Sequence, residues 1–415
     1  MCSMKSNLLM EYIMNPKPIL LFFCITLSLH AQTLREVIDY SQRHNYQLQI
    51  LQEESEIIDR EADIVGAWSD PVLQAGMNDI QAVQPLSRNV EAMQNQFITL
   101  SQAIPLNNRL EIASDVEKEK LLVVEQKKEI LSVNIAFGVR KAFIEAQFAQ
   151  SSLSILDRYI SFLKRPMDLL VNLSAVEKNS VEKYITTQLL QKTYQFKREA
   201  WLRNIEVAKE RIELIGNLKI DNFSDEVVLK NYHYQTLEEL LSLLDMNSPE
   251  LHMRDALKNV ANHEIELAQA KEQTDFTVTG GYYQRFDRND YVSVAVSFPL
   301  YIHKKQSNKT VQAMKKSNIQ NLTYEQTKVQ LEQGLKITFH QLQSLYDELK
   351  ILEQSGVKIN QLISNAKSEL ASGGSLVHYY ELFTKRVNNR LAINKKRLAI
   401  ALNENQIDQL LGVTQ

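Results

Sequence analysis

Four short segments of the chain alternate large apolar residues with small or polar ones at every second position. They cover residues 72–77, 97–104, 276–282 and 292–298. A period of two is the pattern of a β-strand whose two faces meet different surroundings. In the last segment the apolar side is Val292, Val294, Val296 and Phe298, and the small-residue side is Ser293, Ala295 and Ser297.

A very long helical pattern follows each pair of predicted strands. Over 107–173 and 304–371, apolar residues recur in alternating steps of three and four, the seam of a coiled coil. At about 1.5 Å per residue, each run predicts a helix about 100 Å long. Pro166 is expected to kink or break the first helix, because proline removes a backbone hydrogen bond.

Each long helix is expected to end in a short turn, at 174–179 or at 372–374, and to be followed by a return helix. The return helices cover roughly 180–216 and 376–411. Their expected N-caps are Ser180 and Ser375, whose hydroxyls can accept hydrogen bonds from free backbone amides.

Two shorter helices are predicted at 34–65 and 249–272. Thr33 and Glu36 form a capping box before the first of them. Summed lengths suggest that each long helix is matched by two short ones placed end to end. The return helix after Ser180 is expected to continue into 249–272, and the other return helix into 34–65.

The order of elements occurs twice along the chain. Pro105 and Pro299, which follow the second strand of each pair, are 194 residues apart, and Ser180 and Ser375 are 195 apart. We therefore expect a first repeat at 32–216 and a second at 248–415. The interlude at 217–247 has its own capping box at Thr236 and Glu239, and is expected to pack around the middle of the helical rod.

The N-terminal 31 residues have the pattern of a secretory signal peptide. Lys17 precedes the apolar run 19–29, and Ala31 offers a small residue at the cleavage position. Translation could start at Met1 or at Met14. Both cysteines, Cys2 and Cys24, lie in this segment, and Phe22 and Phe23 stand where a lipoprotein site requires small residues. The mature chain is thus expected to begin near Gln32, exported and without cysteine.

Composition excludes several classes of protein. The chain has only 11 glycines and 8 prolines in 415 residues, too few for a sandwich or propeller with many tight turns. Its formal net charge of −3 gives no basic excess for binding nucleic acid.

No pattern of catalytic, metal-ligating or cofactor-binding residues stands out in the sequence. The segment from His263 to Leu267 lacks the second histidine of a His-Glu-x-x-His zinc motif. We therefore expect no enzymatic activity and no cofactor.

Four strands cannot close a barrel on their own, but their pattern is that of an outer-membrane barrel wall, with lipid-facing apolar and lumen-facing small residues. Three chains would supply 12 strands around a water-filled interior. A soluble sheet with one buried face is the other interpretation. Aromatic residues near the strand ends would form a girdle at the membrane surface: Tyr282, Tyr283, Phe286, Tyr291, Phe298 and Tyr301.

The mature chain as a whole resembles the TolC-type outer-membrane efflux proteins. The resemblance rests on the signal peptide, the duplicated strand–strand–long-helix–return-helix unit, the strand exits Ile104-Pro105-Leu106 and Phe298-Pro299-Leu300, and the turn 370–376. It implies a mainly α fold with a small β part. In that fold three chains share a 12-stranded outer-membrane β-barrel, continued by a long periplasmic coiled-coil tunnel.

The resemblance also implies partners and sites. The homotrimer would dock to a periplasmic adaptor protein and an inner-membrane pump of the RND or ABC type, and would contact outer-membrane lipid. The adaptor-docking tips would lie at the turns of the helical hairpins, where Glu177-Lys178 in the first turn departs from the small residues of the second. The tip residues are Gly373, Gly374, Ser375, Leu376 and Ser180.

Two other functions stay open at this point. One is a periplasmic coiled-coil adaptor or scaffold without a pore, and the other is an enzyme or metal-binding protein. The sequence does not distinguish metal ions, drugs and polypeptides as transported substrates, and it identifies no gate residues.

Overall fold

The structure is a computed structural model that describes residues 33–174, 178–223, 230–372 and 375–414. The predicted signal peptide lies outside the described residues. The elements are α1 Leu34–His44, α2 Tyr46–Gly66, β1 Val72–Asn78, β2 Asn95–Ile104, α3 Arg109–Ser174, α4 Lys178–Gly216, a 3-10 turn Tyr232–Tyr234, α5 Leu237–Asn247, α6 Pro249–Ala270, β3 Phe276–Gln284, β4 Tyr291–Ser297, α7 Lys305–Ala371 and α8 Leu376–Leu410.

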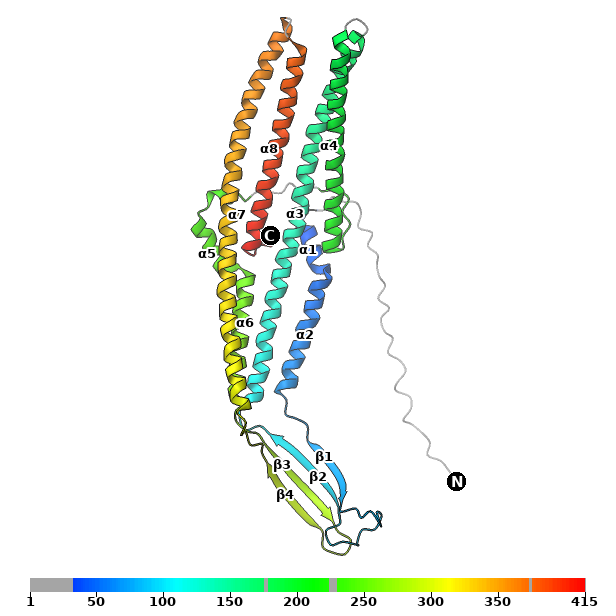
Figure 1. The fold of residues 1–415 in the computed structure, drawn as a ribbon, viewed down its shortest axis with the longest axis vertical. Helices are drawn as coiled ribbons and strands as arrows, with labels where there is room; N and C mark the ends of the chain where they lie inside the picture. Colours follow the sequence, from blue (N-terminus) through cyan, green and yellow to red (C-terminus); the bar gives the residue numbers. More distant parts are fainter. Residues whose placement is uncertain (1–32, 175–177, 224–229, 373–374, 415) are drawn as a thin grey trace, which may run out of the picture.

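The molecule is a long array of helices with one small sheet at its end (Figure 1). Helices α3 and α7 have 66 and 67 residues, so each is about 100 Å long. Each forms an antiparallel hairpin with its return helix, α4 or α8, and these hairpins point away from the sheet (Figure 1). The predicted strands, long helices and return helices are therefore all present.

Two predictions about helix continuity are wrong. Helix α3 runs through Pro166 to Ser174, so the proline does not break it. The helix predicted at 34–65 is instead divided into α1 and α2 at Asn45. The side chain of Asn45 accepts hydrogen bonds from the amides of Gln47 and Leu48, and its own amide donates to the carbonyl oxygen of Ile215 at 2.9 Å. A side chain that caps a new helix and binds a distant one explains the break.

The predicted end-to-end pairing of helices is also wrong. The end of α4 lies against α1, where a Cβ added to Gly216 would meet the side chain of Ser41. The end of α8 lies against the start of α6, where a Cβ added to Gly412 would be 2.7 Å from Cδ of Pro249. Each return helix thus continues into the short helix of its own repeat. Summed lengths could not decide this, because they do not say which ends meet.

The second part of the interlude, with α5, packs beside the middle of α7, whereas its first residues pack against α3 and α4 (Figure 1). Its capping box is formed by Thr236 and Glu239. Leu240 and Leu244 of α5 are fully buried and share a hydrophobic cluster with residues of α7 and α8, among them Leu335, Leu342, Ile400 and Ile407.

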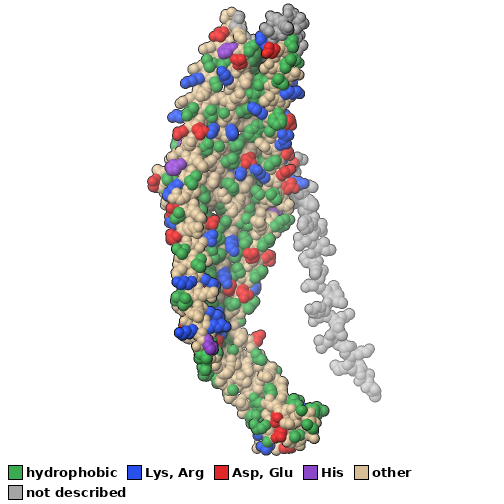
Figure 2. All heavy atoms as spheres, in the orientation of Figure 1, with side chains coloured by type: hydrophobic (Ala, Val, Ile, Leu, Met, Phe, Trp, Pro, Cys, Tyr) green, Lys and Arg blue, Asp and Glu red, His purple; other side chains and the backbone are tan. Residues whose placement is uncertain are grey.

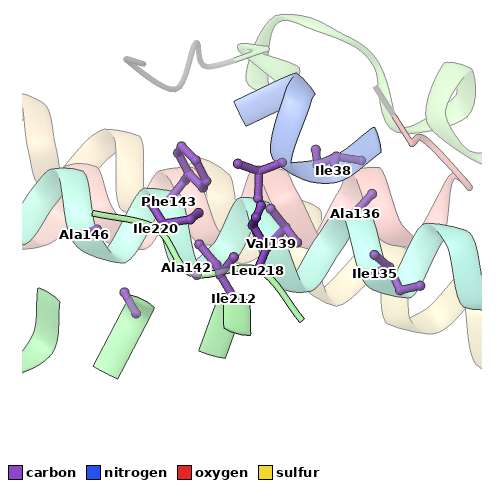
Figure 3. Close-up of a cluster of buried hydrophobic side chains, with 12 residues drawn as sticks. Ile38, Ile135, Ala136, Val139, Ala142, Phe143, Ala146, Ile212, Leu218 and Ile220 are labelled. Atoms are coloured by element: carbon purple, nitrogen blue, oxygen red, sulfur yellow. The ribbon is translucent and has the colours of Figure 1, made fainter. Parts of the chain in front are cut away.

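The main hydrophobic core lies where α1, α3 and α4 meet. Figure 3 shows side chains of α3 pointing toward Ile38 of α1, Ile212 of α4, and Leu218 and Ile220 of the following segment. Phe143 of α3 is 1% exposed and packs edge-on against Phe223. The seam predicted from the apolar periodicity supplies several of these residues, including Val139, Ala142 and Ala146.

The four strands form one antiparallel sheet in the order β1-β2-β3-β4. Strand β2 of the first repeat pairs with β3 of the second, with Leu100 opposite Gly280. The sheet therefore joins the two repeats at one end of the molecule, and β1 and β4 are its edges.

Candidate functional site

The two faces of the sheet differ in the way that the sequence predicts. The register places Leu73, Leu100, Gly280 and Val294 in one row on a face that we call the apolar face. Val292 and Val294 are each 74% exposed there, so the described residues do not cover this face. An uncovered row of this kind is a surface for a partner or a membrane.

The opposite face, which we call the small-residue face, is lined near the helices by Ser, Thr, Gly and Ala. Ser101 and Thr279 lie opposite each other there, with their hydroxyl oxygens 2.8 Å apart. None of the four strands contains a charged residue. In Figure 2 the charged side chains cover the helices and the far loops, while few lie over the sheet between them.

The aromatic residues at the strand ends are divided between the two faces. Tyr282 lies on the apolar face, in the row of Val292 and Ile98. Tyr283 and Tyr291 lie opposite each other on the small-residue face. Successive residues of a strand point to opposite faces, so Tyr283 and Tyr291 do not share a face with Tyr282, and the predicted girdle would not have all of these rings on one face.

Neither edge of the sheet pairs with another strand in the part of the chain that the structure describes. Strand β1 pairs only with β2, and strand β4 only with β3. Each edge presents backbone N–H and C=O groups that can pair with another strand.

The two long edges of the helical part also carry exposed apolar stripes. Helices α2 and α4 form one edge and α7 the other (Figure 1). Spacings of 4, 7, 11 and 22 residues repeat the same face of a helix. The stripe of α2 is Tyr46, Ile50, Ile57 and Ile64; that of α4 is Val181, Ile185, Leu189, Phe196, Val207 and Leu214; and that of α7 is Val311, Leu322, Val329, Ile351 and Leu362.

A buried polar cluster ties the interlude to the middle of the rod. Arg140 of α3 donates to Asp408 of α8 at 2.9 Å, and both side chains are less than a tenth exposed. Asp408 also accepts a hydrogen bond from Tyr232 and lies 3.2 Å from Nζ of Lys230. The sequence analysis missed this cluster. The available signal was a charged residue, Arg140, next to Val139 in the seam of α3.

Glu404 lies beside this cluster and accepts hydrogen bonds from the side chain of Tyr346 and from the backbone of Lys230, Asn231 and Tyr232. The amide of Lys230 donates to it at 2.8 Å and the hydroxyl of Tyr346 at 3.1 Å. Burial raises the pKa of Glu404 above its ordinary value, and burial also raises the pKa of Tyr232 and of Tyr346. The cluster joins α3, α7 and α8, and its residues Lys230 and Tyr232 also line a surface pocket.

A second set of polar and aromatic contacts joins the two hairpins toward their tips. Tyr159 of α3 lies 2.6 Å from the hydroxyl of Thr384 on α8, and the rings of Phe162 and Phe383 stack. Burial raises the pKa of Tyr159 to about 12. These contacts hold the hairpins of the two repeats side by side.

The residues predicted at the tips are only partly within the described structure. Ser375 is the N-cap of α8 and accepts from the amide of His378 at 3.4 Å, as predicted. Leu376 is the first residue of α8, whereas Gly373 and Gly374 lie outside the described residues. The sequence predicts Ser180 as the N-cap of the return helix. Helix α4 instead begins at Lys178, so Ser180 lies in its first turn.

The two strand exits lie between a strand and a long helix. Pro105 directly follows β2, and Pro299 comes two residues after β4. The structure thus brings Pro105 and Pro299 to the junction of the sheet and the rods, far along the helices from Ser180 and Ser375.

Within the described residues, no group of three or more His, Cys, Asp and Glu side chains could hold a metal ion. None of the described helices has a stretch long and apolar enough to cross a membrane.

Comparison with protein families gives a match over the second half of the chain. The family described as outer membrane efflux protein matches residues 240–413, which comprise part of α5, the α6 segment, β3, β4 and the second hairpin. Residues 240–413 therefore resemble the outer membrane efflux proteins. The match confirms the family resemblance and the outer-membrane localisation predicted from the sequence. This efflux family is one of transport proteins and not a class of enzymes.

Solved structures of outer-membrane proteins share the fold over nearly the whole chain. VceC of Vibrio cholerae is 13% identical with a TM-score of 0.72, covering 92% of this chain and 96% of its own. The outer membrane channel MtrE of Neisseria gonorrhoeae is 15% identical with a TM-score of 0.72, covering 92% and 89%. The outer membrane channel CmeC of Campylobacter jejuni is 12% identical with a TM-score of 0.71, covering 91% and 85%. Comparison with curated proteins gives no match.

Proposed function

We propose that three copies of this chain form a channel-tunnel through the outer membrane and into the periplasm. The observation that carries the proposal is the sheet, which has four strands without a charged residue, one exposed apolar face and two unpaired edges. Pairing β1 of one copy with β4 of the next would satisfy both edges and give 12 strands around an aqueous interior.

The stripes along the helices support the same arrangement. In a ring of three copies, the edge made by α2 and α4 would meet α7 of the next copy. Large exposed apolar surfaces on a folded chain mark protein interfaces. The sheet edges and the helix edges of neighbouring copies would then both be paired, so that the barrel continues into a helical tunnel.

We further propose that this tunnel is a passive conduit in a tripartite efflux or secretion system. Its far tips would dock to a periplasmic adaptor protein, and the adaptor would connect to an inner-membrane pump of the RND or ABC type. The tips lie about 100 Å from the sheet by helix rise, so they are the part of the chain nearest to the inner membrane.

Conduction by the purified protein tests the proposal of a channel. Reconstituted into planar lipid bilayers, it should give stable ion currents of uniform size. Protein that inserts with its full strand content but carries no current would contradict the proposal.

The docking proposal is tested at the turn between α7 and α8. Gly374→Trp should leave trimer assembly and insertion unchanged, but weaken crosslinking to the adaptor and efflux, because a bulky side chain would obstruct a compact turn. Retained crosslinking and transport would remove this turn from the docking surface.

A further inference from the structure

Three aromatic rings form a single row across the small-residue face of the sheet. The register places Gly76 of β1, Phe97 of β2, Tyr283 of β3 and Tyr291 of β4 opposite one another. We call Phe97, Tyr283 and Tyr291 the aromatic row. It lies toward the loops that join the strands far from the helices.

The rings of the aromatic row touch one another. The centroids of Tyr283 and Tyr291 are 4.8 Å apart and their planes differ by 4°, which is a stacked pair. The centroids of Phe97 and Tyr283 are 5.7 Å apart. The row is therefore a continuous group of touching rings over three strands, with the rings of Tyr283 and Tyr291 face to face.

Two glycines allow the rings to lie close against the sheet. A Cβ added to Gly76 would be 2.6 Å from the ring of Phe97, and one added to Gly281 would be 2.8 Å from the ring of Tyr283. Any larger residue would push these rings away from the sheet. The rings pack against the sheet, yet the Tyr291 residue is still 39% exposed, so part of it can be reached by a bound molecule.

A cationic group lies at one end of the row. The guanidinium of Arg285 lies over the ring of Tyr291, with Cζ 5.1 Å from the centroid. Its Nε and one terminal nitrogen donate to the carbonyl oxygen of Asn289, at 3.1 and 2.7 Å. Among the described residues it forms no salt bridge. Asp290 of the same loop accepts hydrogen bonds from the hydroxyl of Tyr282 and the backbone amide of Arg285, and its charge also interacts with the guanidinium of Arg285.

We propose that the aromatic row and Arg285 form a binding site on the inner wall of the channel for planar aromatic molecules that carry an anionic group. Aromatic rings bind flat rings by stacking or by edge-to-face contact, and the N–H groups of a guanidinium attract an anion. The proposal rests on the proposed function, since that function makes the small-residue face the wall of an aqueous interior. The further proposal names a class of transported molecule, which would bind briefly to the inner wall as it passes through the channel.

The test compares two sulfonates of equal charge in bilayer recordings. Naphthalene-2-sulfonate should interrupt the current of the native channel for longer than cyclohexanesulfonate, which has no aromatic ring. Tyr283→Leu and Tyr291→Leu should each shorten these interruptions about 3- to 10-fold, as expected for one lost stacking contact. Arg285→Gln should also shorten them. Leucine keeps the apolar bulk, so these variants test the ring itself.

Tyr282→Leu is the matched control, because Tyr282 is the neighbouring residue on the opposite face of the same strand. It should leave the interruptions unchanged. Equal interruptions by both sulfonates, or an equal effect of Tyr282→Leu and Tyr283→Leu, would overturn the proposed site.

A second measurement separates this proposal from that of the channel. Equilibrium binding of naphthalene-2-sulfonate to the protein in lipid nanodiscs, followed by the fluorescence of the probe, requires no current. Binding that depends on Tyr283 in a protein without conductance would contradict the channel and support the site. If the protein conducts ions, but the native protein and Tyr283→Leu bind the probe equally well, the result would support the channel and contradict the site.

Discussion

Helices α3 and α7 are almost equal in length and occupy the same place in their repeats, yet their surroundings differ. Helix α3 is covered by α1, α2, α4, α6 and α8, and it supplies much of the buried core. Helix α7 packs on α6, α8 and α5 and keeps an exposed apolar stripe. The long helix is therefore largely buried in the first repeat, whereas in the second repeat it keeps an exposed apolar side.

This difference supports the proposal that several copies of the chain assemble. An isolated helical protein would gain stability by burying the stripe of α7 or by making it polar. Here the stripes of α2 and α4 lie on the opposite edge, where a second copy can reach α7. The following predictions separate the interior role of α3 from the interface role of α7.

The largest effect is expected in the interior of α3. Phe143→Ala removes a fully buried ring and should lower the free energy of unfolding by about 3–5 kcal/mol. Denaturant unfolding followed by helical circular dichroism measures this. Val329→Ala in the α7 stripe is the control and should change the stability of the chain by less than about 0.5 kcal/mol. Similar losses for the two variants would remove the distinction between α3 and α7.

The next effect concerns the sheet, where the same distinction applies to its two faces. Val294→Arg places a charge on the apolar face and should disfavour insertion by about 2–4 kcal/mol at mid-membrane depth. Ser297→Arg on the small-residue face should be tolerated during folding and should alter conductance instead. Insertion is measured by the fraction of heat-resistant, membrane-extracted protein. If both substitutions impair insertion alike, the assignment of faces is wrong.

A substitution in the apolar stripe of α7 is expected to affect the fold less than these changes, but to affect assembly clearly. Leu322 is 71% exposed in the single chain, so Leu322→Asp should leave the helices folded. It should shift the protein from trimer to monomer, because a carboxylate would be buried at the interface between copies. The readout is mass in detergent beside far-ultraviolet circular dichroism. A trimer of unchanged stability would exclude this stripe from the interface.

The smallest effect is a dependence on pH at Glu404. Burial raises the pKa of Glu404 in the folded state, so folding favours its protonated form. Its stabilising contribution is complete below the ordinary pKa of glutamate and is lost as the pH rises through the raised value. The difference in unfolding midpoint between the native protein and Glu404→Gln should therefore change across this range. If the difference in unfolding midpoint between the two proteins does not change with pH, the pKa of Glu404 is not raised by folding.

The elements of the fold could be predicted from the sequence because each follows from a local pattern. A period of two marks the strands, and steps of three and four mark the long helices. The division at Asn45 could not be predicted, since it depends on a hydrogen bond to Ile215, far away in the chain. The pairing of helix ends likewise depends on contacts such as Gly412 with Pro249.

The candidate sites were predicted less completely. Alternation alone could have placed Tyr282 and Tyr283 on opposite faces, but grouping the aromatic residues by type hid this. The cluster around Asp408 joins residues from both repeats and from the interlude, and no sequence spacing brings Arg140, Lys230 and Asp408 together.

The mass of the detergent-solubilised protein tests most directly whether three copies close edge to edge. Native mass spectrometry of protein extracted from the outer membrane should give three times the mass of one chain, together with strand content expected for the four strands. A monodisperse monomer that retains this strand content would contradict the account, because β1 and β4 would then be stable without partners.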